Sequence, residues 1–225
     1  MAWVSLRKGL HRCLPGSTVQ PVDVTQETLK RLGPDAKICD VGAGGRRITP
    51  NTFTIDGFVS ENTDLICDVH KIDLECDLFD CVFCTGTLEH VTDPDLVVDE
   101  IIRIARPGGI IHIEVPFIQG FHADPHDYWR WTLEGLRLFC NKKGLEELNS
   151  GVHIGPSSSL VWILNEYFHC LCGENVFGKL VSIIARFSFA PIRYLDYMLN
   201  ARDCAKRIAS GVYFVGKKQP GLKSL

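Results

Sequence analysis

Ile38-Cys39-Asp40-Val41-Gly42-Ala43-Gly44 joins an apolar run to an acid and then to two glycines one residue apart. This order is typical of a buried parallel strand that ends in a tight turn, where bare backbone approaches a ligand. Glycine suits such a turn because a Cβ would hold the ligand off the chain and would disfavour positive φ. The segment therefore predicts a ligand-binding turn after the first strand.

Strand-like and helix-like segments alternate on both sides of this turn. Apolar strand-like runs are expected at 37–41, 53–56, 64–68, 79–85, 110–115 and 212–215. Helices are expected at 26–32 with Thr25 as N-cap, after Asp93-Pro94 until Pro107-Gly108-Gly109, and from Thr132 to Gly144. The alternation predicts an α/β fold with a mostly parallel, Rossmann-like doubly wound sheet and right-handed crossovers.

Chain length, net charge and cysteine content argue against a nucleic-acid-binding, a disulfide-rich and a membrane-spanning protein. The chain has 225 residues, which suits one domain with an annex, and its formal net charge of −3 gives no reason to expect nucleic-acid binding. The ten cysteines lie mostly in apolar runs without zinc-finger spacing, so we expect reduced thiols and a cytoplasmic protein. The basic segment from Met1 to Gln20 lacks a signal-peptide core, and no apolar run approaches the roughly 18 residues of a membrane span.

Four strand ends carry groups that suit a ligand. They are the Asp40 to Gly44 turn, Asp56, Asp68 and Thr85. Ligands of open α/β sheets bind beyond the carboxyl ends of the strands, where these groups should meet. A carboxylate at Asp56 can accept both hydroxyls of a ribose, and Asp68 with Val69 could contact an adenine.

The third glycine of a dinucleotide-binding turn is missing, because Arg47 occupies its position and Pro50 disturbs the helix that should follow. An acid, a Gly-x-Gly turn and a second acid suit a cationic nucleoside without phosphate. S-adenosylmethionine has that character, with an ammonium group, a sulfonium and a ribose.

The segment Phe79-Asp80-Cys81-Val82-Phe83-Cys84-Thr85-Gly86-Thr87-Leu88-Glu89-His90-Val91, followed by Asp93-Pro94, resembles the fourth-strand signature of class I S-adenosylmethionine-dependent methyltransferases, in particular the type 11 small-molecule group. Ala105-Arg106-Pro107-Gly108-Gly109 resembles the family's turn into the fifth strand, and 209–216 resembles its antiparallel last strand. The resemblance covers about 37–144 and implies a seven-strand sheet. It also implies cofactor contacts, with the methionine portion at Asp40, Gly42, Ala43 and Gly44, the ribose at Asp56, the adenine at Asp68 and Val69, and the amino-acid moiety beside Thr85. The short first crossover and Arg46-Arg47 depart from the family pattern.

A polar and aromatic segment, residues 116–132, follows the fifth strand and should lie over the transferable methyl group. Deprotonation of an oxygen or nitrogen acceptor suits a histidine. His126 is the first candidate base, oriented by Asp124 or Asp127, and His122 and His90 come next. Alternatively, Asp127-Tyr128-Trp129-Arg130 is a structural plug, with Trp129 in the core and Arg130 paired with Asp127.

Two other functions are compatible with the sequence. His122, Asp124 and His126 form a plausible ligand set for a metal-dependent hydrolase, although the acidic strand ends would then have no role. A methyltransferase-like scaffold could also bind its cofactor or a partner without turnover.

Residues 159–208 form a markedly apolar helical insertion. It is read either as a lid on the sheet or as a membrane-facing element through 159–200, with Lys179, Arg186 and Arg193 at its polar edge. In the second case the small-molecule acceptor would be amphipathic or lipid-linked.

The expected organisation of the chain has four parts. They are an N-terminal segment with a short helix over 1–36, a cofactor-binding core over 37–158, the insertion over 159–208, and a last strand with tail over 209–225.

Overall fold

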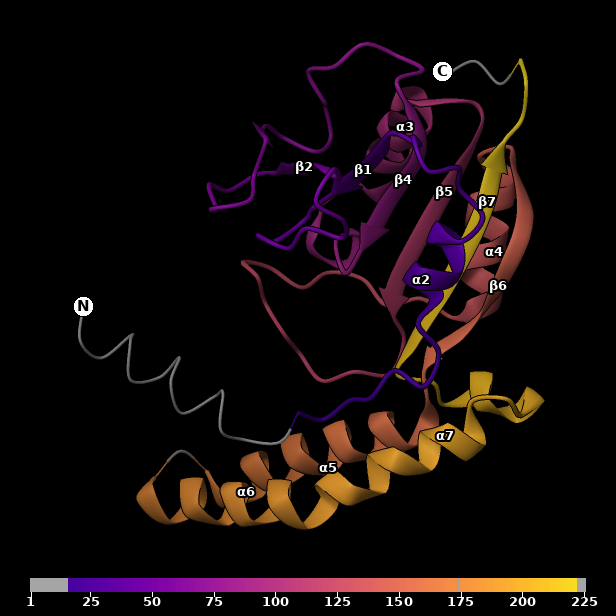
Figure 1. Ribbon diagram of the computed structural model, residues 1–225. Helices are drawn as coiled ribbons and strands as arrows, with labels where there is room; N and C mark the ends of the chain where they lie inside the picture. The colour runs from indigo at the N-terminus through magenta and orange to yellow at the C-terminus, as the bar shows by residue number, and fades with distance from the viewer. Residues whose placement is uncertain (1–15, 174, 222–225) are drawn as a thin grey trace. The chain divides into compact units, whose positions relative to one another are not determined.

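The computed structural model describes residues 16–173 and 175–221, and they form two compact units (Figure 1). The sheet unit contains the described residues of 23–117, 121–151 and 211–221. The helical unit contains the described residues up to 22, then 118–120 and 152–210. The basic residues of the N-terminal segment, which precede residue 16, lie outside the described residues.

The sheet unit is built on seven strands in the order β3-β2-β1-β4-β5-β7-β6. Their bounds are β1 Ile38–Val41, β2 Phe53–Asp56, β3 Leu65–Ile66, β4 Phe79–Thr85, β5 Ala105–Pro116, β6 Leu145–Ile154 and β7 Gly211–Lys218. Strands β1 to β5 pair in parallel, and β7 runs antiparallel to β5. The predicted fold class, a doubly wound and mostly parallel seven-strand sheet with an antiparallel last strand, is confirmed.

Helices cover both faces of this sheet (Figure 1). Helix α2, Val24–Leu29, packs Val24 on Tyr213 and Val215 of one face. Helices α3, Pro94–Ile104, and α4, Leu133–Lys142, lie against the opposite face. Each helix buries one apolar stripe, as the spacing of their apolar residues requires.

Three element boundaries differ from the sequence-based expectations. Asp23, not Thr25, caps α2, because its carboxylate accepts the Gln26 N–H at 2.9 Å, so the Thr25 prediction is wrong. Helix α3 ends at Ile104, since Ala105 already pairs with Phe79 in the sheet. The third strand shrinks to two residues.

The sixth strand, β6, has no strong signal in the sequence. Its apolar residues are interrupted by Glu146-Glu147 and by Asn149-Ser150-Gly151, and most of its residues stay partly exposed. Such a half-solvated edge strand lacks the continuous apolar run that marks the central strands.

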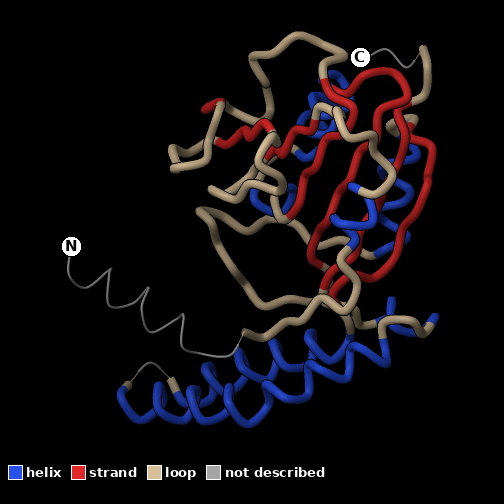
Figure 2. The backbone as a smooth tube through the Cα atoms, in the orientation of Figure 1, coloured by secondary structure: helices blue, strands red, loops and turns tan. Residues whose placement is uncertain are grey.

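The helical unit contains an antiparallel helix pair, α5 Pro156–Cys172 and α6 Val176–Phe189 (Figure 2). Short helices follow as η2 Ala190–Leu195, α7 Asp196–Leu199 and η3 Asp203–Arg207. The buried Asp196 carboxylate accepts the backbone N–H groups of Ser157 and Ser158 at 2.7 and 2.9 Å, which satisfies the start of α5. The longest segment of the helical unit is 152–210, whereas the insertion was expected over 159–208.

Candidate functional site

The turn after β1 has the backbone conformation that its glycines allow. Gly42 has φ 75° and Gly44 has φ 58°. The Gly42 N–H donates to the Ile55 carbonyl at 2.8 Å, and a Cβ at Gly42 would overlap the side chain of Thr87. A Cβ at Gly44 would meet nothing within 4 Å. The turn is therefore held firmly on one side and open at Gly44, as a ligand contact requires, with Ala43 buried between the two glycines.

Asp40 is fully buried directly before this turn. Its carboxylate receives Arg46 Nε at 3.1 Å and Arg46 Nη2 at 3.1 and 2.9 Å. Burial raises the pKa of Asp40 to about 6, although the Arg46 guanidinium opposes that rise. Arg46, a departure from the family pattern, is therefore the residue that holds the Asp40 charge in place.

Asp56 ends β2 beside the turn. It is 9% exposed, and its two oxygens accept the Gly44 N–H at 2.7 Å and the Phe58 N–H at 2.9 Å. A carboxylate offers about four lone-pair sites, so two remain for hydroxyl donors. The carboxylate is thus oriented by backbone and retains capacity for a diol.

Asp68 and Val69 lie after β3. Val69 is buried, whereas Asp68 is exposed and its Oδ1 contacts His70 Nδ1 at 2.6 Å. Hydrogen bonds from the backbone and ring of His70 lower the pKa of Asp68. His70 therefore contacts Asp68 through Oδ1, and both of its hydrogen bonds fall on that one oxygen.

Thr85, the last residue of β4, has a hydroxyl that could bind a polar ligand. The residue is buried, its Oγ1 has no hydrogen-bond partner among the described residues, and it pairs with Glu114 of β5. Buried hydroxyls are rarely left unsatisfied. The orphaned Thr85 hydroxyl, the open face at Gly44 and the buried Asp56 carboxylate lie at the ends of adjacent strands, and they fit a ligand with an ammonium group and a ribose.

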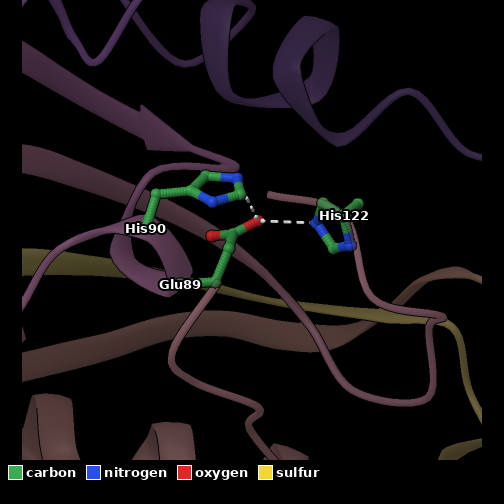
Figure 3. A group of neighbouring side chains, drawn as sticks. All are labelled: Glu89, His90 and His122. Carbon is green, nitrogen blue, oxygen red and sulfur yellow. Dashed lines mark ion pairs between the residues drawn. The ribbon is translucent and has the colours of Figure 1, made fainter. Parts of the chain in front are cut away.

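Three side chains converge beyond β4 (Figure 3). Glu89 and His90 lie on η1, Leu88–His90, and His122 lies on the loop after β5. Glu89 Oε1 is 3.8 Å from His90 Nε2 and 3.7 Å from His122 Nε2. Glu89 is 3% exposed, and sequence reasoning gave it no role. The sequence does carry one signal for Glu89, because this acid lies next to His90 in a segment flanked by the apolar residues Leu88 and Val91.

His126 differs from the other two histidines. Its ring is exposed and lies 5.4 Å from the Tyr128 ring, while Asp127 pairs with Arg130 through a 2.7 Å contact to Nη2. Asp127 also accepts the His122 N–H at 2.9 Å, and the hydrogen bond from Arg130 moves the pKa of Asp127 well below its usual range. The carboxylate expected to orient His126 therefore serves His122 and Arg130.

The ligand set His122, Asp124 and His126 is not formed. The Asp124 N–H faces the His126 carbonyl at 3.4 Å, and within the described part of the chain the ligand atoms of these three side chains do not converge. Among the described residues, the group whose ligand atoms lie within 4.8 Å of one another is Glu89, His90 and His122. The hypothesis of a metal site at His122, Asp124 and His126 is wrong.

Residues 127–130 were alternatively interpreted as a structural plug, and the structure supports one of the two contacts expected for it. Arg130 does pair with Asp127, but Trp129 is 41% exposed and is not a core residue. Its indole N–H donates to the Val91 carbonyl at 2.9 Å, which fixes this loop to the chain after η1.

Comparisons with known proteins find similarity to methyltransferases. Residues 22–113 match the family model described as a methyltransferase domain. The chain is 26% identical over 174 residues to the ubiquinone/menaquinone biosynthesis C-methyltransferase UbiE of Burkholderia multivorans, covering 65% of this chain and 71% of that protein. It is 31% identical over 91 residues to the ubiquinone biosynthesis O-methyltransferase of Pectobacterium atrosepticum, covering 38% of this chain and only 35% of that protein.

Solved structures show the same fold at low sequence identity. Phosphoethanolamine N-methyltransferase 2 of Haemonchus contortus, in complex with S-adenosyl-L-methionine, matches with TM-score 0.55 and 17% identity over 88% of this chain and 53% of that chain. The [4+2]-cyclase SpnF matches with TM-score 0.56 and 17% identity over 88% of this chain and 80% of that chain.

Proposed function

We propose, from its membership of the class I S-adenosylmethionine-dependent methyltransferases, that this chain transfers a methyl group to an oxygen or nitrogen of a small molecule. The observation that supports this most is the meeting of an open glycine turn, a buried carboxylate and an orphaned hydroxyl at adjacent strand ends. Relatives described as O- and C-methyltransferases indicate the reaction class without fixing the acceptor atom.

The cofactor contacts are proposed residue by residue. Asp56 would bind the ribose, the turn from Asp40 to Gly44 and Thr85 would hold the methionine portion, and Val69 would pack on the adenine. Asp68 would contact the adenine through Oδ2, because His70 contacts Oδ1. When bound, S-adenosylmethionine supplies an activated methyl group, and the protein's part is to align the acceptor and remove its proton.

His122 is better placed than His126 to take part in removing the acceptor's proton. Its Nε2 faces the buried Glu89 carboxylate and its Nδ1 lies 3.7 Å from Asp127, whereas His126 is exposed and packs on Tyr128. A carboxylate on one side of an imidazole orients the ring and stabilises its protonated form. His90 stands beside it, with the two ring centroids 5.3 Å apart.

Turnover is the direct test of this function. Purified protein would be incubated with S-adenosylmethionine and panels of hydroxylated and amine acceptors, and S-adenosylhomocysteine release would be measured. Mass and NMR analysis of the product identifies the methylated atom. We expect His122→Asn to lower the rate at least about tenfold. Cofactor binding without release on any acceptor would support the non-catalytic scaffold instead.

We further propose that the α5 and α6 helix pair contacts a membrane surface and that the acceptor is amphipathic or lipid-linked. Large apolar side chains are exposed at helical spacing on α6, with Phe177 at 71%, Leu180 at 55% and Ile184 at 57%. Lys179 is exposed on the same helix. Apolar side chains beside basic ones suit an anionic interface. No described helix is long and apolar enough to cross a membrane.

Sedimentation with anionic vesicles tests this contact. We expect the wild type to sediment with phosphatidylserine vesicles and the variant Phe177→Ser/Leu180→Gln/Ile184→Gln to remain in the supernatant. Leu138→Gln, which changes an exposed leucine of α4, is the matched control and should sediment like the wild type. Equal sedimentation of the triple variant and the wild type would contradict the proposal.

A further inference from the structure

We propose that Glu89, His90 and His122 bind a divalent transition-metal ion next to the acceptor, an inference that rests on the proposed function and gives it an oxygen acceptor. These three residues are the metal-competent group among the described residues. Two imidazoles and one carboxylate are ligands that zinc and related first-row ions favour.

The distances suit a single ion. Zinc binds nitrogen and oxygen ligands at about 2.0–2.2 Å, which places ligand atoms of a tetrahedral site about 3.4 Å apart. Glu89 Oε1 lies 3.8 Å from His90 Nε2 and 3.7 Å from His122 Nε2. In Figure 3 this oxygen lies between the two rings. All three ligand atoms lie within 4.8 Å of one another, so side-chain adjustments would have to bring them closer around an ion.

The outer nitrogen of each ring faces an acceptor. His90 Nδ1 is 2.5 Å from the His126 carbonyl oxygen, which fixes the proton on Nδ1 and leaves the Nε2 lone pair toward Glu89. His122 Nδ1 lies 3.7 Å from Asp127 Oδ2. Ligating histidines almost always donate their second N–H to a carbonyl or carboxylate, which orients the ring and raises its basicity.

The Glu89 carboxylate supplies an independent observation. It is 3% exposed, and its Oε2 has no hydrogen-bond partner among the described residues. A buried carboxylate with an unsatisfied oxygen is costly unless it is paired or coordinates a metal. A cation bound by Oε1, the oxygen between the two rings, would compensate the charge of this buried carboxylate.

The backbone holds the two parts of this group together. The Glu89 carbonyl accepts the N–H groups of Tyr128 and Trp129 at 2.7 and 3.3 Å. These bonds tie the loop that carries His122 to η1, which carries Glu89 and His90. The ligands are therefore preorganised rather than recruited from a free loop.

Three protein ligands leave a coordination position for the acceptor. A hydroxyl bound there loses its proton to water more readily, so its oxygen would be presented for methylation as an alkoxide. This role replaces proton abstraction by His122, because its Nε2 lone pair cannot hold a metal and a proton at once. The metal site therefore favours oxygen acceptors over amines.

Zinc binding to the full chain is the test, measured by calorimetry and by the thermal shift on adding Zn²⁺. We expect stoichiometric binding by the wild type and at least about tenfold weaker binding by Glu89→Gln and by His122→Ala. Glu89→Gln keeps the side-chain shape and removes an unsatisfied charge, so it should fold. His126→Ala keeps the carbonyl that accepts from His90 and is the matched control, with unchanged affinity.

Two results would overturn the metal site. One is no stoichiometric zinc binding by the wild type. The other is equal affinity in the wild type, Glu89→Gln and His122→Ala, which would place the ion elsewhere, for example on exposed thiols such as Cys76 or Cys204. Either result leaves the binding of S-adenosylmethionine untouched, so failure of the metal site and failure of the proposed function are distinguishable.

Discussion

Arg46 reaches back across the glycine turn to contact both carboxylate oxygens of Asp40, the fully buried acid at the end of β1. A buried carboxylate without such a partner would be strongly destabilising. The Arg46 side chain is itself 46% exposed, so solvent screens part of this attraction. The pair stabilises the turn from outside the sheet.

A double-mutant cycle measures this pair. Arg46→Ala should lower the free energy of unfolding by about 1–3 kcal/mol at pH 8, because it leaves a buried charge unpaired. Adding Asp40→Asn should recover most of that loss. Urea denaturation of the four proteins gives the coupling energy, and simple additivity of the two changes would show that the pair contributes nothing.

Asp40 also predicts a pH dependence. Burial raises its folded-state pKa from 3.8 to about 6, so its contribution to stability is fully present below the unfolded pKa and is lost as pH rises through about 6. The stability of the wild type relative to Asp40→Asn should therefore fall by about 2 kcal/mol between pH 4 and pH 7. Denaturation curves at several pH values check this. A flat difference would mean that Asp40 titrates normally.

The two glycines of the turn should respond differently to alanine. Both have positive φ, which costs an alanine about 1–2 kcal/mol. At Gly42 the new Cβ would also overlap the Thr87 side chain, whereas at Gly44 it would meet nothing within 4 Å. Gly42→Ala should thus lower the thermal midpoint clearly more than Gly44→Ala. Calorimetric melting of both variants decides the order, and equal shifts would contradict the packing described.

Asp196 should be important for the helical unit. Its carboxylate is buried and accepts two backbone N–H groups at the start of α5. Asp196→Ala leaves these donors unsatisfied and should cost about 1–3 kcal/mol. Asp203→Ala changes an exposed acid nearby in sequence and serves as the control. Hydrogen exchange of α5 reports the loss locally, and equal protection in both variants would show that this cap is dispensable.

The sequence predicts the central strands because β1 and β4 are continuously apolar and end in recognisable groups. It does not predict β6, whose polar and half-exposed residues resemble a loop. The Asp40, Asp56 and Thr85 positions follow from parallel strands, whose carboxyl ends share one sheet edge. The preference for His122 over His126 does not follow, because it depends on a loop turn that brings Asp127 to His122 and leaves His126 exposed.

The cofactor site is tested most directly by calorimetry with S-adenosylmethionine on wild type, Asp56→Ala and Asp35→Ala. Asp56 is fixed by the Gly44 N–H beside the glycine turn, whereas Asp35 is exposed ahead of β1. We expect micromolar binding by the wild type and by Asp35→Ala, and at least about tenfold weaker binding by Asp56→Ala. Equal affinity in all three proteins would contradict a ribose contact at Asp56.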